Sequence, residues 1–485
     1  MCSCTEDDDW SNGNNWSPVV DFDSYDPDDR ITINDDVIIR ADVTIPALED
    51  YDWAYEANKV TFEGGATLTI ADGGRLASNN SVNGTIQKHI NHYEDYYGRD
   101  NYYLLSLPVS AGYYGYNPSN AGMITDSEFD LYYFDEAQTG MEWRSYNPGD
   151  NGGAPFSLEQ RKGYLYANSA DVDLSFSGTF MRSDLPVVYN LSNTGTGEFA
   201  GLNLVGNPFI CQAYLTYYDA NDEAFLEVDY YVLDGDAIDV VPTMDYINPC
   251  SGAFVVADEN MYDAEEEEYR VYFFSEINSG LGNKKAATLN ITLDNNNRSG
   301  KHLDVARLRL GQGIGLKKFM LNPNGSKIYF PQANADYSVV YTENAGEMPL
   351  NFKAESNGTY RLSFSNENVE FNYLHLIDNM TGADVDLLAT PSCSFEANST
   401  DYASRFTIVF ATGKTDDSFA YFSNGSFVIS NEGNATLQVV DVMGRIISSE
   451  TINGSANVSV NAAPGVYMLR LVNGNDMKVQ KVVVK

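Results

Sequence analysis

The distribution of apolar and polar residues predicts short β-strands along the whole chain. Within Ile31–Ile45, apolar pairs recur every six residues, and further pairs follow up to Leu76 at a step of eight. Short strands separated by Asn, Asp and Gly turns produce this spacing. For residues 1–90 the pattern predicts either a short stack of β-solenoid rungs, capped by the Trp10 and Trp16 segment, or the start of a β-sandwich. We prefer the solenoid-like stack.

Residues 91–285 are predicted to form a Tyr-rich, all-β domain. Runs such as Tyr102–Leu107 and Tyr269–Phe274 have the composition of strands. Pro and Gly interrupt these runs, as at Asn147-Pro148-Gly149 and Gly206-Asn207-Pro208.

The alternation becomes more regular in the C-terminal half of the chain. Strand patterns every 8 to 15 residues, separated by corners such as Asn357-Gly358, predict an antiparallel β-sandwich. Six shorter strand patterns then predict a small immunoglobulin-like sandwich of six or seven strands. The predicted fold class is therefore all-β and multidomain. Its predicted segments are 1–90, 91–285, 286–415 and 416–485.

The composition excludes several classes of protein. The 485 residues include 69 Asp and Glu against 29 Lys and Arg, which gives a net charge of −40. Such a surface repels the phosphate backbone, so we expect no nucleic-acid partner. The chain is 43% hydrophobic and 13% aromatic, which is too apolar for a disordered acidic chain.

The N-terminal residues and the cysteines leave questions open. Met1–Asp9 has neither the basic region nor the apolar region of a secretory signal peptide, and no apolar run reaches the roughly 20 residues of a membrane helix. The chain is then either intracellular or a secreted protein whose N-terminus lies upstream, and its C-terminal residues favour the second interpretation. Cys211 and Cys250 lie in one β-rich region, and whether they pair is open. If they do, Cys393 is left as a small buried hydrophobe.

Motifs for catalysis are not found in the sequence. The four histidines do not form a His-Glu-x-x-His motif, and no Gly-x-Ser-x-Gly elbow or phosphate-binding loop is present. His89 and His92 are three residues apart, but this spacing fits a surface pair better than a metal site. We therefore expect a protein that is not an enzyme and needs no cofactor, with a hydrolase as the least favoured alternative.

Two kinds of ligand remain as hypotheses. Asp21, Asp23, Asp26 and Asp28 form an acidic cluster that could supply oxygen ligands to Ca²⁺, and Asp234–Asp239 is a similar segment. The simpler interpretation is that both are solvated acidic turns.

Aromatic residues suggest the second ligand. Trp53 and Trp143 are candidates for stacking on sugar rings, although aromatic residues in strands usually pack in the core.

Three ordered blocks near the C-terminus resemble a known family. They are Asn434–Arg445, Ala463–Leu471 and Lys478–Lys485. Together they resemble the type A C-terminal sorting domain of the type IX (Por) secretion system of the Bacteroidota. The residues that carry the resemblance are Asp441, Gly444, Arg445, Pro464, Gly465, Val466, Tyr467, Lys478 and Lys481.

The same residues have physical roles in a small sandwich. Gly444 stands where a hairpin turn needs a positive φ, and Pro464-Gly465 turns the chain into the next strand. Lys478 and Lys481 make the last strand basic, which suits recognition by a translocon component and also protects an edge strand from pairing.

The resemblance implies a destination for the protein. Such domains direct a folded cargo across the outer membrane, after which the domain is typically cleaved and the cargo is released or attached to surface lipopolysaccharide. The polar linker near Gly413–Phe419 is the expected cleavage position. We therefore expect a secreted or outer-membrane surface protein with a structural or adhesive cargo. Its expected partners are the type IX translocon and its sorting machinery, and a host surface ligand is open. The alternative is a glycan-binding surface module of a polysaccharide-using system.

Overall fold

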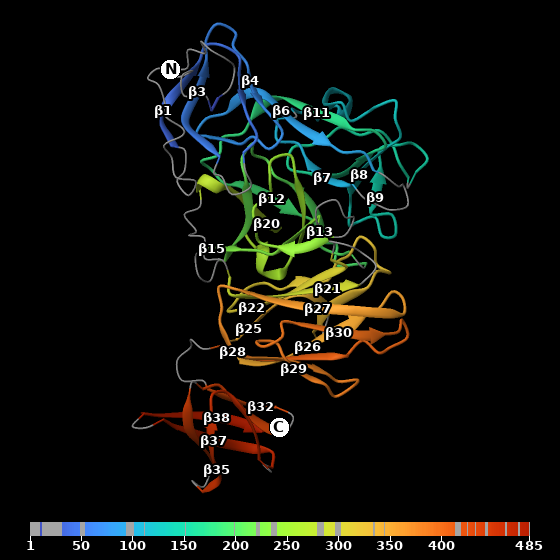
Figure 1. Cartoon of the computed structure of the whole chain (residues 1–485). Coiled ribbons are helices and arrows are strands. Elements are labelled where there is room, and N and C mark those ends of the chain that lie inside the picture. Colours follow the sequence, from blue (N-terminus) through green and yellow to red (C-terminus); the bar gives the residue numbers. More distant parts are fainter. Residues whose placement is uncertain are drawn as a thin grey trace. The chain divides into compact units, whose positions relative to one another are not determined.

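A computed structural model shows that the regular elements of the described residues are nearly all β-strands (Figure 1). It forms two compact units, residues 1–284 and 285–485, and each is described by itself. Among the described residues the helical elements are three short 3₁₀ turns, η3 (Pro118–Ala121), η4 (Glu259–Met261) and η5 (Glu276–Asn278). The described residues are 10–11, 32–48, 54–93, 101–110, 112–150, 152–197, 199–219, 224–233, 240–278, 286–295, 302–332, 335–343, 345–412, 419–423, 425–431, 433–441, 445–460, 463–473 and 476–484.

The first six strands form a three-rung stack. Consecutive strands join two sheets alternately, and neighbours from successive rungs pair in parallel, as in a β-solenoid. Ile45, Ile70 and Ile86 occupy matching positions in three successive rungs and are almost fully buried. One sheet contains β1 (Thr32–Ile39), β3 (Tyr55–Phe62) and β5 (Leu76–Ser78), and the other β2 (Val43–Ile45), β4 (Leu68–Ile70) and β6 (Val82–Ile90).

Both ends of this stack are covered by other parts of the chain. The backbone N–H of Trp10 donates to the carbonyl of Thr44 on β2, and the Trp10 side chain is fully buried beside Tyr55. Trp10 therefore caps the stack, whereas Trp16 lies outside the described residues. On the other side β6 pairs antiparallel with β11 (Val172–Phe180) along its whole length. The sheet thus continues beyond residue 90 into the Tyr-rich region.

Three antiparallel sheets follow within the first unit. Their Tyr residues form much of the core, and Tyr166, Tyr230 and Tyr231 are fully buried. The first sheet contains β7 (Tyr103–Ser106), β8 (Phe129–Phe134), β9 (Trp143–Ser145) and β10 (Gly163–Asn168). The second contains β12 (Val187–Leu191), β14 (Ala213–Asp219), β15 (Ala224–Glu227), β19 (Tyr262–Asp263) and β20 (Glu268–Ser275). The third contains β13 (Leu202–Gly206), β16 (Tyr230–Leu233), β17 (Val240–Thr243) and β18 (Gly252–Val256).

The Gly206-Asn207 pair joins these sheets. A Cβ on Gly206 would lie 2.5 Å from the Ser106 side chain and 2.8 Å from the Lys162 carbonyl, so the close approach of β13 to its neighbours requires glycine. The fully buried amide of Asn207 donates to the carbonyls of Cys211 and Ile247 at 2.9 and 2.8 Å. The turn thus connects backbone segments that are distant in the sequence.

The cysteines do not form the disulfide that the sequence left open. Cys211 and Cys250 are both fully buried free thiols. Burial raises the pKa of Cys250 to about 12, which keeps its thiol protonated at neutral pH. Cys393 is free and half-buried rather than buried, because it lies on β30, an edge strand of the large sheet in the second unit.

The second unit begins with a large sheet that folds back on itself. β24 joins its two halves by pairing with β25 on one side and β26 on the other. Side chains from both halves, including Ile291 and Ile408, meet in one core. The strands are β21 (Thr288–Asn295), β22 (Asp304–Leu310), β23 (Leu316–Lys317), β24 (Lys327–Pro331), β25 (Asp336–Thr342), β26 (Ala345–Lys353), β27 (Gly358–Glu367), β28 (Phe371–Asp378), β29 (Asp384–Asp386), β30 (Ser392–Ala397) and β31 (Phe406–Thr412).

A buried ion pair lies at the end of this core. The Arg405 guanidinium donates to the Asp378 carboxylate at 3.0 Å, and its carbon lies 4.5 Å from the centre of the Phe395 ring. Burial alone would raise the pKa of Asp378, but hydrogen bonds from Arg405 and the Met380 amide outweigh it and lower that pKa below its ordinary value. Asp378 therefore stays ionised at neutral pH and keeps Arg405 in place over the aromatic core.

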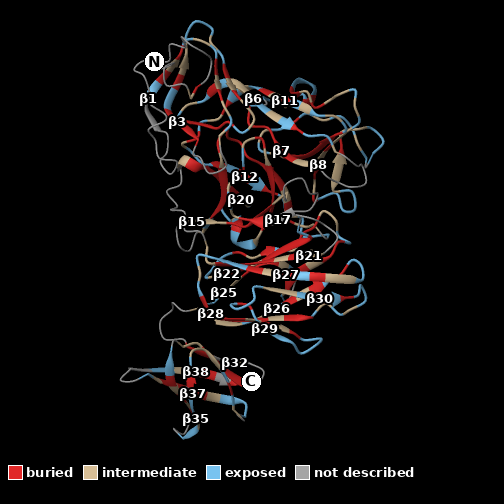
Figure 2. Ribbon diagram, in the orientation of Figure 1, coloured by how far each residue is buried: buried red, intermediate tan, exposed pale blue. Residues whose placement is uncertain are grey.

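The last seven strands form a small sandwich of two sheets, as the alternation predicted (Figure 2). The burial pattern alternates along its strands, and Leu437, Val439 and Leu469 face the core. One sheet contains β32 (Ala420–Ser423), β33 (Ser426–Ile429) and β36 (Ala456–Ser459). The other contains β34 (Asn434–Asp441), β35 (Ile446–Asn453), β37 (Gly465–Asn473) and β38 (Asp476–Val484).

Removal of the Asn207 amide should destabilise the first unit. Asn207→Ala removes the donor to the Cys211 carbonyl, one of two donors to the Ile247 carbonyl and the acceptor of the Phe209 amide. We expect a loss of about 3 kcal/mol in the free energy of unfolding. Chemical denaturation of the purified protein measures this loss. Asn58→Ala, which changes an exposed amide, should stay within about 0.5 kcal/mol. An equal effect of both substitutions would contradict the role given to Asn207.

Candidate functional site

The hairpin between β34 and β35 is organised by Asp441. Its carboxylate accepts hydrogen bonds from the Arg445 backbone amide at 3.0 Å and from Arg445 Nε at 2.7 Å. The Asp441 backbone N–H in turn donates to the Arg445 carbonyl at 2.9 Å. The two predicted motif residues therefore close the same turn, and the Arg445 side chain stays largely exposed. Gly444 lies outside the described residues.

The second motif block places Tyr467 beside that hairpin. Pro464 and Gly465 are exposed where β37 begins, Val466 is half-buried, and Tyr467 is the first buried side chain of the strand. The Tyr467 hydroxyl donates back to the Ala463 carbonyl at 2.8 Å, and its backbone is paired opposite Asp441. The first two blocks thus meet on adjacent strands.

The third block forms the edge strand β38. Lys478 is exposed, and Lys481 pairs through its backbone with Met468. Residues 419–485 contain five of the 29 Lys and Arg but only four of the 69 Asp and Glu of the chain. The acidic excess therefore lies in the residues before this sandwich.

Gln480, which the sequence analysis did not single out, fastens the first strand of the sandwich. Its side-chain oxygen accepts from the backbone amides of Phe419 and Ala420 at 2.5 and 2.7 Å. Its side-chain nitrogen donates to the Ala420 carbonyl at 2.6 Å. One amide side chain on β38 therefore binds the start of β32 in the way that a neighbouring strand would.

The comparison with family models agrees with this geometry. The model described as "Secretion system C-terminal sorting domain" matches residues 423–485. The chain carries a type IX secretion sorting domain. All three motif blocks lie within the matched residues, and the protein is thereby a secreted or cell-surface protein.

Other comparisons give less. A search of curated proteins found no match. The chain is similar to a solved structure described as "Biofilm associated protein - BSP domain", with 9% identity over 82% of this chain and 98% of that chain. The TM-score is 0.15, which does not indicate a shared fold.

Within the described ranges, no helix is long and apolar enough to cross a bilayer.

Of the residues predicted to bind sugar or calcium, the structure describes only Trp143. Trp143 is half-buried on β9, and its ring packs edge-on against Phe134 and Phe254 at 5.1 and 5.8 Å. The more exposed aromatic pair is Tyr113 and Tyr114, which are 95% and 87% exposed. Trp53, Asp21, Asp23, Asp26 and Asp28 lie outside the described residues, as does Asp234–Asp239. A calcium site there stays a prediction.

A cleft of about 780 Å³ opens beside β8, β12 and β13. Its floor is buried and includes Leu204 and Val205 of β13. Its rim is formed by the turn Glu159–Lys162, which precedes β10, and by Asn190 of β12. The lining thus combines buried apolar side chains with polar side chains that can meet a ligand.

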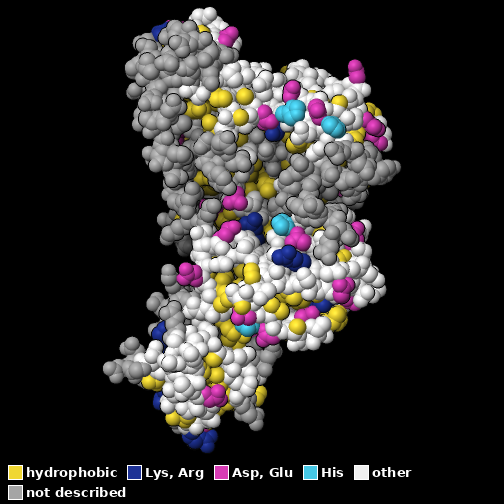
Figure 3. All heavy atoms as spheres, in the orientation of Figure 1, with side chains coloured by type: hydrophobic (Ala, Val, Ile, Leu, Met, Phe, Trp, Pro, Cys, Tyr) yellow, Lys and Arg dark blue, Asp and Glu magenta, His cyan; other side chains and the backbone are white. Residues whose placement is uncertain are grey.

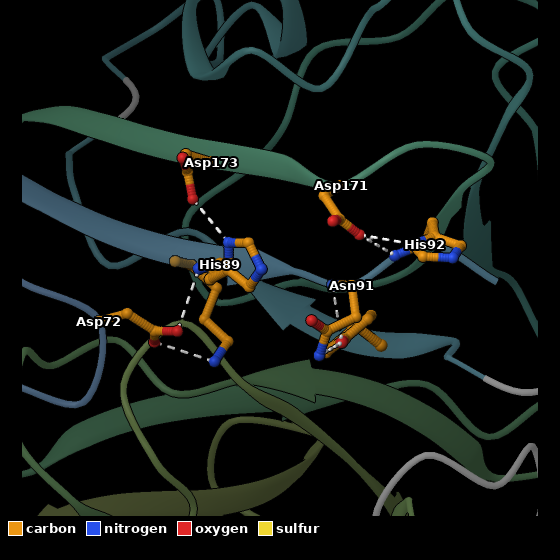
Figure 4. A network of polar contacts seen from close by, with 8 residues as sticks. Asp72, His89, Asn91, His92, Asp171 and Asp173 are labelled. Carbon is orange, nitrogen blue, oxygen red and sulfur yellow. Dashed lines mark hydrogen bonds and ion pairs between the residues drawn. The ribbon is translucent and has the colours of Figure 1, made fainter.

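Every histidine of the chain pairs with an aspartate through Nδ1. The pairs are His89–Asp173, His92–Asp171, His302–Asp294 and His375–Asp384, all at 2.6 or 2.7 Å. The first two form one network over β6 and β11, where histidine and acidic side chains lie together on the surface (Figures 3 and 4). In the same network Asp72 accepts from the His89 amide at 3.1 Å. His89 on β6 and His92 just beyond it are therefore exposed, and each is hydrogen-bonded to an aspartate on or just before β11.

Loss of the Gln480 amide should loosen the start of the sorting domain. Gln480→Leu keeps the size of the side chain but removes three hydrogen bonds, so we expect the domain to lose about 1 to 3 kcal/mol. Hydrogen exchange at the Phe419 and Ala420 amides should also become faster. Gln438→Leu, a half-buried glutamine on β34, is the matched control. These three hydrogen bonds of the Gln480 side chain are called the Gln480 clamp. Unchanged protection of the Phe419 and Ala420 amides from hydrogen exchange in Gln480→Leu would contradict it.

The His89–Asp173 pair predicts a pH dependence. The hydrogen bond to Asp173 raises the pKa of His89 above its ordinary value of 6.5. The small stabilisation from this exposed pair is complete below pH 6.5 and is lost as the pH rises through the raised pKa. We expect Asp173→Asn to return the His89 pKa toward 6.5 in an NMR titration, whereas Asp384→Asn should not. An unchanged pKa of His89 in Asp173→Asn would refute this assignment.

Proposed function

We propose that this protein is a secreted or surface-anchored structural or adhesive protein, exported by the type IX secretion system. The single observation that supports export is the sorting domain, matched over residues 423–485 and folded with its motif blocks together. Residues 416–485 then act as the sorting signal, and the translocon and its sorting machinery are the partners.

A structural or adhesive role fits the architecture of the cargo. The described residues before 413 form a three-rung stack, three antiparallel sheets and a folded sheet with a continuous core. Such modules present stable surfaces on a rigid scaffold. Their acidic excess favours solubility outside the cell. We therefore propose a role in surface architecture or attachment, with no enzymatic activity and no required cofactor.

Processing is proposed to occur between the cargo and the sorting domain. The polar segment near Gly413–Phe419 is the expected cleavage position. The Gln480 clamp on Phe419 supports this assignment, because it holds the beginning of the sorting domain in a folded sheet. After cleavage the cargo is released or attached to surface lipopolysaccharide.

Glycan binding at the cell surface is the second candidate function. The observation that favours it is the cleft beside β12 and β13, with its polar rim and buried floor. The exposed rings of Tyr113 and Tyr114 add a second surface on which a sugar could stack. A glycan array separates this candidate from a purely structural role. Saturable binding that is lost in Trp143→Ala or Trp53→Ala would favour glycan binding.

Deletion of residues 419–485 in the native host tests export. The truncated protein should accumulate in the periplasm and disappear from the surface, because it lacks the sorting domain that the translocon recognises. Cell fractionation and surface labelling measure both pools. Full surface display of the truncated protein would exclude the sorting role.

A point variant gives a finer test of the same domain. Asp441→Ala removes the carboxylate that closes the β34–β35 turn, whereas Glu450→Ala changes an exposed carboxylate on β35. We expect surface display to fall for Asp441→Ala alone, with both proteins folded as judged by thermal melting.

A further inference from the structure

The turn Glu159–Lys162 at the rim of the cleft is held in an unusual conformation. Arg161 has φ of +78°, in the region that glycine adopts without strain. The backbone around it is fixed, because the Lys162 amide donates to the Glu159 carbonyl and the Gly206 amide donates to the Arg161 carbonyl. An arginine here strains a turn that glycine would form readily. Strain of this kind concentrates at functional sites, which points to a use for the guanidinium.

Polar groups converge on the cleft from this turn. Arg161 is exposed and donates to the Val188 carbonyl at 3.2 Å. Lys162 lies 4.6 Å from the centre of the Tyr133 ring and 3.5 Å from Glu159. Gln160 lines the same cleft, and its buried side-chain nitrogen has no hydrogen-bond partner among the described residues. A buried donor of this kind calls for an acceptor, which a ligand can supply.

The edge of β12 beside the cleft is already occupied by side chains. Arg161 takes the Val188 carbonyl, and the Asn203 side chain binds both the amide and the carbonyl of Ser192. A peptide that added a strand to this edge would have to displace these bonds. The arrangement therefore disfavours peptide binding by strand addition and leaves side-chain donors and acceptors as the recognition groups.

The charge of the cleft indicates the kind of ligand. Three basic and three acidic side chains line it, although acidic residues outnumber basic ones more than twofold in the chain. Glu136 is buried and already accepts from the Thr194 amide and hydroxyl, and Arg270 is paired with Asp263, so neither faces a ligand as a free charge. Two acidic and two basic side chains remain. Such a balanced rim attracts neither a polyanion nor a polycation. It instead offers both donors and acceptors to hydroxyl groups.

We propose that this cleft binds a neutral glycan. Arg161, Gln160 and Lys162 donate to sugar oxygens, Glu159 accepts from sugar hydroxyls, and the apolar floor of β13 faces the ring carbons. The inference rests on the second candidate function and names its site and ligand class. It does not depend on export, because the binding is a property of the purified chain.

Calorimetry of the full chain with defined hexasaccharides tests the proposal. The neutral probes are β-1,4-linked glucose, α-1,4-linked glucose and β-1,4-linked mannose, and the comparison ligands are a galacturonate hexasaccharide and an extended decapeptide. We expect at least one neutral probe to bind saturably and the comparison ligands to bind more weakly. No neutral binding, or a preference for the acidic sugar or the peptide, overturns the proposal.

Two substitutions place the binding in the cleft. Arg161→Gly removes the guanidinium and relieves the backbone, so the protein should be at least as stable while affinity falls about tenfold or more. Gln160→Leu, which keeps the side chain at a similar volume but removes its amide, should also weaken binding. Arg182→Ala, an exposed arginine outside the cleft, is the control and should bind like the wild type. Unchanged affinity in Arg161→Gly would show that the glycan binds elsewhere, and the cleft assignment would fall.

Discussion

In an all-β chain, the N–H and C=O groups on the outer edge of each sheet have no strand partner, and each sheet depends on what these groups bind instead. Here side chains and single residues fill that role. Trp10 binds the edge of β2, Asn203 binds the chain just beyond β12, and Gln480 binds the start of β32. These contacts limit strand addition by other chains, and they also position the cleft and the beginning of the sorting domain.

Much of the architecture could be predicted from the sequence because a strand has a local signal. Alternation of apolar residues indicated a small C-terminal sandwich of six or seven strands, and seven are found in the described residues. The short spacing at Ile31–Ile45 favoured the solenoid-like stack over the start of a sandwich. The sorting domain could be recognised because its three blocks keep their order. In each case the information lies within a few neighbouring residues.

The rest depends on register between distant strands, which alternation does not encode. His89 meets Asp173 only because β6 pairs with β11 across more than eighty residues. Gln480 looks like any polar position of an edge strand, and its role follows from its distance to Phe419. The contacts of Trp143 with Phe134 and Phe254 also come from strand pairing and could not be predicted from the sequence, and its role in stacking on sugar stays a prediction.

The antiparallel pairing of β6 with β11 also sets the length of the three-rung stack. A solenoid can usually be lengthened by duplicating a rung, because each rung repeats the same contacts. An added rung between β4 and β6 would shift β11 by one interstrand spacing, roughly 4.8 Å. The sheets connected to β11 would have to move with it. The stack is therefore fixed at the end where β6 meets β11, and changes in its length should be tolerated only at the end that Trp10 covers.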